Sequence, residues 1–203
     1  EETVRTPVEV KICGLTRRCD VVLAAGLGAG YVGFVLVPAS PRCVPVERLR
    51  ELTGGLPAGV KRVGVFADAD RETILRAAEG NFDIIQLHGE ESPEFAASLP
   101  YPVWKAVRAV AGTELAPLAE WKVERFLFDA ASGGSGRRCD WSLAAQAARR
   151  WRIMLAGGLS PENIREAIQT VHPVGVDLSS SLETAPGIKS EEKMKTLFEE
   201  IVQ

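Results

Sequence analysis

The sequence is short of the residues that build metal centres and disulfide frameworks. It has four cysteines and two histidines in 203 residues. No two cysteines form a CxxC pair, and the spacing of cysteine and histidine matches no zinc-binding pattern. We therefore expect free thiols and no metal site. The six side chains are Cys13, Cys19, Cys43, Cys139, His88 and His172.

Long apolar runs and clusters of basic charge are also missing. No run approaches the ~20 apolar residues of a membrane span, and residues 1–7 are too polar for a signal peptide. The net charge is only −3, and the basic residues are dispersed, so nothing points to a nucleic acid or an anionic membrane as partner. We expect a cytoplasmic protein with a polar N-terminal leader at residues 1–7 and one domain at residues 8–203.

The dinucleotide-binding pattern GxGxxG is absent from the first strand and turn, which disfavours a doubly wound sheet. No central strand is apolar on both faces, as the strands of such a sheet would be. About eight strand-then-helix units follow one another instead, which predicts an α/β fold, a (β/α)₈ barrel in a single domain. The strands are predicted at residues 8–12, 31–37, 61–67, 83–87, 103–107, 125–128, 152–156 and 174–178.

Local signals predict how some of these units continue. Thr16 is expected to cap the first helix, and Ser160 with Pro161 to open a later one. Residues 112–120 contain Pro117 and predict an irregular connection. Residues 130–136 are rich in glycine and serine and predict a flexible loop.

The first predicted strand divides its residues between two faces. Val10 and Ile12 suit covering helices, whereas Lys11 and Cys13 alternate onto the opposite face. The Lys11 ammonium would favour the thiolate of Cys13, although a lone cysteine is more often a small buried hydrophobe. Polar residues in other strands predict the same polar face, which suits a substrate mouth: Gln86, Lys105 and Asp177.

In a barrel of this type the active site lies at the carboxyl ends of the strands. Cys13 ends the first strand and Asp129 the sixth, so the two could act as base and acid across the mouth. This chemistry needs a pKa lowered at the thiol and raised at the carboxyl group. The alternative for Asp129 is a helix cap or a loop carboxylate.

Two loops predict a phosphate-binding site. Gly157 and Gly158 follow the seventh strand and precede a helix, while Ser179 and Ser180 follow the eighth. Backbone N–H groups there would lie beside the positive end of a helix dipole, in the loops that commonly hold phosphate in this fold. The alternative is that the glycines only serve tight turns.

Three further residues are candidates for binding substrate. Arg42 could hold a carboxylate with its guanidinium fork, or it could be a solvated loop cation. His88 is interpreted as a hydrogen-bonded wall of the site rather than a catalyst. Asp177 is polar and is predicted to face the interior of the barrel. If Cys13 and Asp129 are not the catalytic base and acid, His88 and Asp177 are the next candidates.

The chain resembles the phosphoribosylanthranilate isomerase family of tryptophan biosynthesis. The resemblance implies a TIM barrel and an Amadori rearrangement of N-(5-phosphoribosyl)anthranilate to 1-(o-carboxyphenylamino)-1-deoxyribulose 5-phosphate, without metal or cofactor. It also implies that Cys13 is the general base, that Asp129 is the general acid, and that Arg42 binds the anthranilate carboxylate. The matching motifs are KICGLT at 11–16, SPR at 40–42, VGVF at 63–66, QLHGEE at 86–91, GGSG with CDW at 133–141, AGGLSPEN at 156–163 and GVDLSSSLETAPGIK at 175–189.

The sequence departs from the family pattern at three positions. Ser181 replaces a common glycine and Ser190 a common aspartate, which bears on phosphate affinity rather than on reaction type. Cys139 replaces a common phenylalanine and is interpreted as a packing substitution.

Three alternatives remain open. A related histidine-pathway sugar-phosphate isomerase, or a dual-substrate form, usually has two aspartates, which the thiol of Cys13 disfavours. A non-catalytic phosphate-binding barrel is disfavoured by Cys13, Asp129 and Arg42 together. The chain begins with Glu1, so it can also be trimmed or be one domain of a bifunctional polypeptide with indole-glycerol-phosphate synthase.

Overall fold

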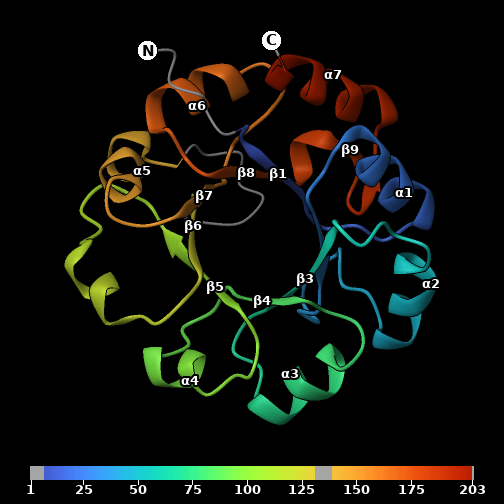
Figure 1. Cartoon of the computed structure of the whole chain (residues 1–203), viewed down its shortest axis with the longest axis horizontal. Coiled ribbons are helices and arrows are strands. Elements are labelled where there is room, and N and C mark those ends of the chain that lie inside the picture. Colours follow the sequence, from blue (N-terminus) through green and yellow to red (C-terminus); the bar gives the residue numbers. More distant parts are fainter. Residues whose placement is uncertain (1–6, 131–138, 203) are drawn as a thin grey trace.

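Eight parallel strands close into a barrel in chain order, from β1 to β8, with β8 paired to β1. The computed structural model describes residues 7–130 and 139–202. The strands surround the centre and the helices form an outer ring (Figure 1). The predicted (β/α)₈ barrel is therefore confirmed. The barrel strands are β1 Glu9–Ile12, β2 Tyr31–Val35, β3 Lys61–Phe66, β4 Ile84–Leu87, β5 Val103–Arg108, β6 Arg125–Asp129, β7 Ile153–Leu155 and β8 Gly175–Leu178.

The helical elements follow the strands as the sequence predicts, although several are short. The predicted irregular connection around Pro117 is a 3₁₀ helix, η2. The elements are α1 Arg18–Leu27, η1 Val46–Arg48, α2 Leu49–Thr53, α3 Arg71–Ala78, α4 Pro93–Ala97, η2 Ala116–Glu120, α5 Trp141–Ala148, α6 Ile164–Val171, η3 Ser180–Leu182 and α7 Glu191–Val202. No helix within residues 7–130 and 139–202 is long and apolar enough to cross a membrane.

Two predicted helix caps are wrong. Thr16 does not cap α1, because its hydroxyl donates to the carbonyl of Gly187 and the helix begins at Arg18. Ser160 does not cap α6, which begins only at Ile164. The side chain of Asn163 instead accepts a hydrogen bond from the amide of Ser160.

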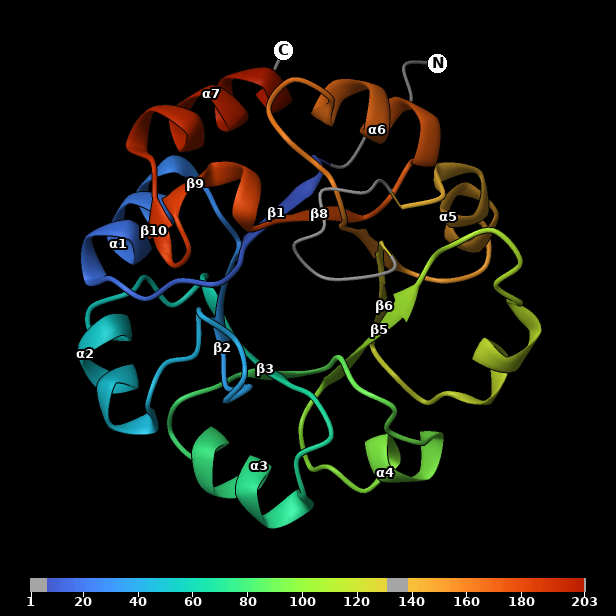
Figure 2. The same cartoon turned by 180° about the vertical axis from the view of Figure 1, so that it is seen from behind.

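A small hairpin that the sequence did not predict follows η3. It consists of β9, Glu183–Ala185, and β10, Ile188–Lys189, which pair antiparallel. The hairpin lies beside α1 in both views of the molecule (Figures 1 and 2). It brings residues from the end of the barrel back toward the first βα unit, where Thr16 binds it through Gly187.

The core has an outer and an inner layer. Apolar residues such as Val10, Ile12 and Val176 pack outward against the helices. The inner cluster fills the barrel with Tyr31, Val63, Ile84, Trp104, Leu127, Met154 and Ala156. At the amino ends of the strands, Arg125 binds Glu9. The guanidinium of Arg125 lies 5.3 Å and 5.1 Å from the ring centroids of Tyr31 and Trp104. This end of the barrel is closed by packed side chains.

The polar face predicted for the interior is confirmed with one exception. Lys11, Gln86 and Asp177 are buried, and their neighbours on the adjoining positions face the helices. The predicted inward orientation of Lys105 is wrong. Its neighbours Trp104 and Ala106 contribute to the inner cluster, so Lys105 points outward. Its ammonium binds Glu91 at 2.8 Å instead. The described residues omit 1–6 of the predicted leader and 131–138 of the predicted flexible loop with its GGSG motif.

Candidate active site

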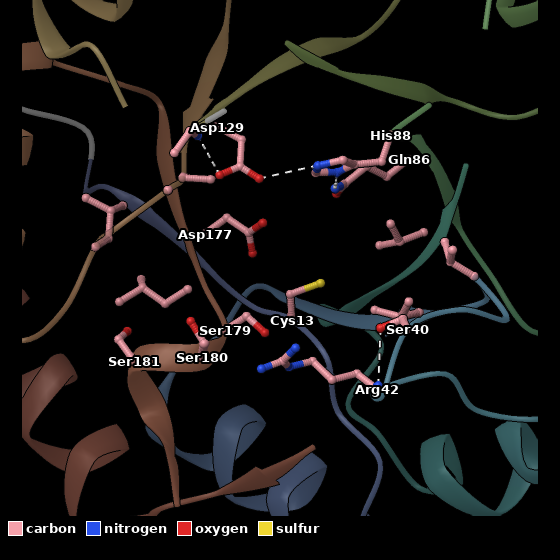
Figure 3. A pocket seen from close by; sticks show the side chains of 18 of the residues that line it. Cys13, Ser40, Arg42, Gln86, His88, Asp129, Asp177, Ser179, Ser180 and Ser181 are labelled. Carbon is pink, nitrogen blue, oxygen red and sulfur yellow. Dashed lines mark hydrogen bonds and ion pairs between the residues drawn. The ribbon is translucent and has the colours of Figure 1, made fainter. Parts of the chain in front are cut away.

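A cavity of about 670 Å³ opens at the carboxyl ends of the strands, and all nine predicted site residues line it. A volume of this size is typical of pockets that bind small molecules. Side chains from opposite sides of the barrel converge on it (Figure 3). The nine are Cys13, Arg42, His88, Asp129, Gly157, Gly158, Asp177, Ser179 and Ser180.

The thiol of Cys13 is held at the tip of β1. Its backbone amide donates to the carbonyl of Leu178 at 2.9 Å, which continues the β1–β8 pairing by one residue. The residue is 8% exposed. A Cβ atom on Gly33 of β2 would lie 2.7 Å from Sγ of Cys13 and 3.1 Å from Nζ of Lys11. The missing side chain of Gly33 therefore gives the thiol and the ammonium their space inside the barrel.

The predicted lowering of the Cys13 pKa is wrong. Burial raises the pKa of this thiol, and the positive charge of Lys11 opposes the rise without cancelling it. Lys11 is itself paired, with Nζ 3.1 Å from each carboxylate oxygen of Asp177. Burial also raises the pKa of Asp177, against the effect of Lys11. The cation that the sequence placed behind the thiol is thus shared with an anion.

Asp129, at the end of β6, is oriented by two contacts. Its Oδ1 accepts a hydrogen bond from the amide of Ala130 at 2.7 Å. Its Oδ2 lies 3.3 Å from Nε2 of His88, which extends from the end of β4 (Figure 3). On the other side of the ring, Nδ1 of His88 lies 3.4 Å from Nε2 of Gln86. A ring proton on Nε2 would be donated to Asp129, and Nδ1 would then accept a hydrogen bond from the amide of Gln86.

Arg42 is neither a solvated cation nor a free fork. Its Nε and Nη2 bind the carboxylate of Glu183, and the guanidinium side chain is 19% exposed. The hydrogen bonds that Arg42 donates to Glu183 raise the pKa of Arg42, which keeps it charged. The guanidinium extends from the β2–η1 loop to a position beside Cys13 and Ser179 (Figure 3). Only part of the predicted fork is therefore left for a substrate.

Two backbone loops, which follow β7 and β8, form part of the cavity wall. Gly157 and Gly158 both have positive φ, 78° and 68°, a conformation that favours glycine. The side chain of Asn163 donates to the carbonyl of Gly158 at 2.8 Å and fixes this turn. Because α6 begins at Ile164, the predicted helix dipole does not start at Gly158. The helical turn that starts in the wall is η3, at Ser180.

Sequence reasoning missed the residues that hold these groups in place. Glu183 and Lys189 fall within the quoted motif at 175–189, but no role was read from them. Gly33 gave no signal, since a glycine within a strand has many explanations. Within the described ranges, no group of three or more His, Cys, Asp or Glu is arranged to hold a metal ion.

Comparison with known proteins gives consistent matches over most of the chain. The family model for N-(5'-phosphoribosyl)anthranilate (PRA) isomerase matches residues 10–200. The N-(5'-phosphoribosyl)anthranilate isomerase of Pelobacter propionicus is 43% identical over 193 residues, covering 93% of this chain and 92% of that protein. The crystal structure of the Thermus thermophilus phosphoribosyl anthranilate isomerase is 40% identical, with a TM-score of 0.90 over 96% of this chain and 98% of that one. A phosphoribosyl anthranilate isomerase solved with reduced 1-(o-carboxyphenylamino)-1-deoxyribulose 5-phosphate has a TM-score of 0.83 at 35% identity, with 96% and 98% covered.

Proposed function

The chain belongs to the N-(5'-phosphoribosyl)anthranilate isomerase family, and we propose that the cavity at the carboxyl ends of its strands performs this reaction. The enzyme converts N-(5-phosphoribosyl)anthranilate to 1-(o-carboxyphenylamino)-1-deoxyribulose 5-phosphate in tryptophan biosynthesis. One observation carries the assignment of roles: a thiol and a carboxyl group line one cavity together with the guanidinium of Arg42 and the two glycine- and serine-rich loops that follow β7 and β8.

Asp129 would act first, as the general acid. It protonates the furanose ring oxygen, and the bond between that oxygen and C1 breaks as the nitrogen lone pair forms a C1=N bond. The ring thereby opens to a protonated Schiff base. The contact with His88 at 3.3 Å supports this role, because it holds one carboxyl oxygen in a fixed direction.

Cys13 would act second, as the general base. Its thiolate removes the proton from C2, and the electrons of that C–H bond form C1=C2 while the C=N electrons return to nitrogen. The resulting enolamine becomes the ketone when the C2 hydroxyl loses its proton and C1 gains one. Since burial raises the pKa of Cys13, the thiol must lose its proton before this step.

The two ends of the substrate carry negative charge, and the cavity offers a site for each. The free edge of Arg42 suits the anthranilate carboxylate. The backbone of Gly157, Gly158, Ser179 and Ser180 suits the phosphate. Ser181 lines the same wall, and its buried hydroxyl has no hydrogen-bond partner among residues 7–130 and 139–202. A phosphate would provide that partner, so this departure from the family pattern is compatible with binding.

We propose three further properties of this enzyme. His88 and Asp177 line the cavity, and both would contact the substrate there. The enzyme works in the cytoplasm, which cell fractionation tests. Fusion to, or association with, indole-glycerol-phosphate synthase is tested by the mass of the native protein.

The deciding experiment is a turnover assay with freshly formed phosphoribosylanthranilate. We expect turnover by the natural chain, loss of turnover in Cys13→Ser, and slowing by at least about 10²-fold in Asp129→Asn. Circular dichroism should show that both variants fold. A chain that binds substrate without converting it would be a binding barrel. A chain that prefers the histidine-pathway substrate would support the alternative isomerase.

A further inference from the structure

The carboxylate of Glu183 lies between two cations at the edge of the cavity. It begins the hairpin strand β9, whereas Arg42 comes from the loop after β2, 141 residues earlier in the chain. Both carboxylate oxygens lie 3.0 Å from Nε of Arg42, and Oε1 lies 2.5 Å from Nη2. The amide of Gly187 donates to Oε2 at 2.7 Å, and Nζ of Lys189 lies 3.4 Å from the same oxygen.

The three charged groups are shielded from solvent to different degrees. The side chains of Lys189 and Glu183 are 0% and 4% exposed, whereas that of Arg42 is 19% exposed. Burial works to raise the pKa of Glu183, but Arg42 and Lys189 outweigh it, so the pKa is lowered and the group is ionised. Two cations and one anion leave one positive charge, and the exposed member of the group, Arg42, lines the cavity.

The contacts determine which edge of Arg42 is available. Nε and Nη2 are occupied by Glu183, and Nη1 has no hydrogen-bond partner among residues 7–130 and 139–202. The stem is confined as well, because a Cβ on Gly14 would lie only 2.7 Å from Cδ of Arg42. A guanidinium fixed at its stem and on one edge presents the other edge in one orientation.

We propose that Glu183 is a positioning residue that fixes Arg42 with its Nη1 edge toward the cavity, where it meets the aryl carboxylate of the substrate. This inference rests on the proposed function. A free arginine side chain would lose rotamer entropy on binding an anion, and prior fixation removes that cost from the binding step. Glu183 therefore acts on the carboxylate end of the substrate through Arg42, without touching the substrate.

Lys189 connects this cluster to the phosphate end of the cavity. Its ammonium donates to the carbonyl of Ser179 at 3.0 Å, at the start of the loop that follows β8. A simpler interpretation is that Glu183 and Lys189 only hold the hairpin against the barrel. The two interpretations differ in their effect on ligand affinity. A purely structural contact would support the binding of every ligand equally, whereas a positioning residue for Arg42 supports the binding only of ligands that carry the carboxylate.

The test compares two stable product analogues, 1-(o-carboxyphenylamino)-1-deoxyribitol 5-phosphate and 1-phenylamino-1-deoxyribitol 5-phosphate. Their dissociation constants are measured by calorimetry for the natural chain and for Glu183→Gln, which keeps the side chain's shape. We expect Glu183→Gln to weaken binding of the carboxylated analogue by at least about tenfold and to change binding of the phenyl analogue less than about twofold. In an Arg42→Ala background the same change should no longer alter the ratio of the two constants.

A matched control is available at the other end of the barrel. Glu9 also binds an arginine, Arg125, through both of its oxygens. Glu9→Gln should leave the ratio of the two dissociation constants unchanged. If Glu183→Gln does not fold, Glu183→Asp, which shortens the carboxylate by one methylene, takes its place with the same expected direction.

The outcomes separate this proposal from the proposed function. Equal weakening of both analogues, or no weakening of either, would overturn the positioning role of Glu183 while turnover by the natural chain still stood. Equal binding of both analogues by the natural chain would show that Arg42 does not bind the carboxylate. It would thereby also overturn the positioning role of Glu183. Absence of turnover by the natural chain would instead overturn the assigned activity, whatever the analogues do.

Discussion

The ammonium of Lys11 lies 3.1 Å from each carboxylate oxygen of Asp177, inside the barrel and beside the thiol of Cys13. The two charges act on the thiol in opposite directions. Burial raises the pKa of Cys13 most, Lys11 lowers it, and Asp177 raises it. The ion pair therefore shifts the fraction of thiolate in both directions, on top of the larger effect of burial.

Replacing either member of this pair should move the pKa of Cys13 in a known direction. Lys11→Met removes the stabilising cation and raises the pKa further, so less thiolate is present at neutral pH. Asp177→Asn removes the opposing anion and lowers the pKa. If thiolate limits the rate, kcat/KM rises with pH toward the pKa of Cys13, and a displacement of one unit changes the neutral rate about tenfold. The rising limb should shift to higher pH in Lys11→Met and to lower pH in Asp177→Asn.

The pH dependence of Cys13 alkylation checks this shift without substrate. Peptide mass spectrometry separates Cys13 from Cys19, which is exposed and reports the reagent itself. Shifts of the same sign in both variants would mean that the pair acts on the thiol through packing and not through charge.

Prediction from the sequence worked where the information is local. The alternation of Val10, Lys11, Ile12 and Cys13 determined which side chains face the helices and which face the interior, and the structure agrees. Placement of a residue at a strand end was also enough to bring Cys13 and Asp129 to one cavity. Both inferences need only the pleat of a strand and the polarity of a parallel barrel.

Prediction failed where a balance of effects or a distant contact decides. The pKa direction of Cys13 depends on burial and Asp177 against the cations Lys11 and Lys189, and burial cannot be measured from a sequence. The partner of Arg42 is Glu183, 141 residues away in the chain, and only closure of the barrel brings them together. Thr16 has the residue type of a helix cap, but the hairpin offered its hydroxyl a tertiary partner in Gly187. Such competition between local and tertiary hydrogen bonds is not visible in local patterns.

His88 should influence the rate through Asp129. Its Nε2 lies 3.3 Å from Oδ2 of the carboxyl group that we assign as the acid. His88→Asn shortens the side chain and removes this contact, so we expect kcat to fall by about 10- to 100-fold with a smaller change in KM. In an Asp129→Asn background the same replacement should have little further effect. Steady-state kinetics of the single and double variants measure this coupling.

The second histidine provides a control for that experiment. His172 is exposed and ends α6 with a φ of 53°, a conformation that asparagine tolerates. His172→Asn should leave kcat and KM unchanged. Additive effects of His88→Asn and Asp129→Asn would show that His88 does not act through the acid.

Arg42→Lys should weaken substrate binding although the charge is kept. An ammonium is a point charge and cannot bind Glu183 along one edge while presenting a second edge to a carboxylate. If that contact is equally strong in the ground state and the transition state, KM should rise and kcat should remain close to its natural value. Unchanged kcat/KM in Arg42→Ala would exclude the residue from the site.

Gly157→Ala should lower kcat by more than backbone strain alone would explain. The residue has a φ of 78°, and a Cβ there would lie 2.4 Å from the backbone nitrogen of Ala130 and 2.7 Å from Oδ1 of Asp129. The acid must move to make room, so we expect both a lower kcat and a loss of stability. Gly112 provides the matched control, since its φ is 88° and a Cβ would meet nothing within 4 Å. Gly112→Ala should cost about 1 kcal/mol in the free energy of unfolding and leave kcat unchanged, whereas equal kcat in the two variants would show that Asp129 tolerates displacement. Denaturant unfolding and initial rates measured on the same preparations separate the effect of strain from the effect on the acid.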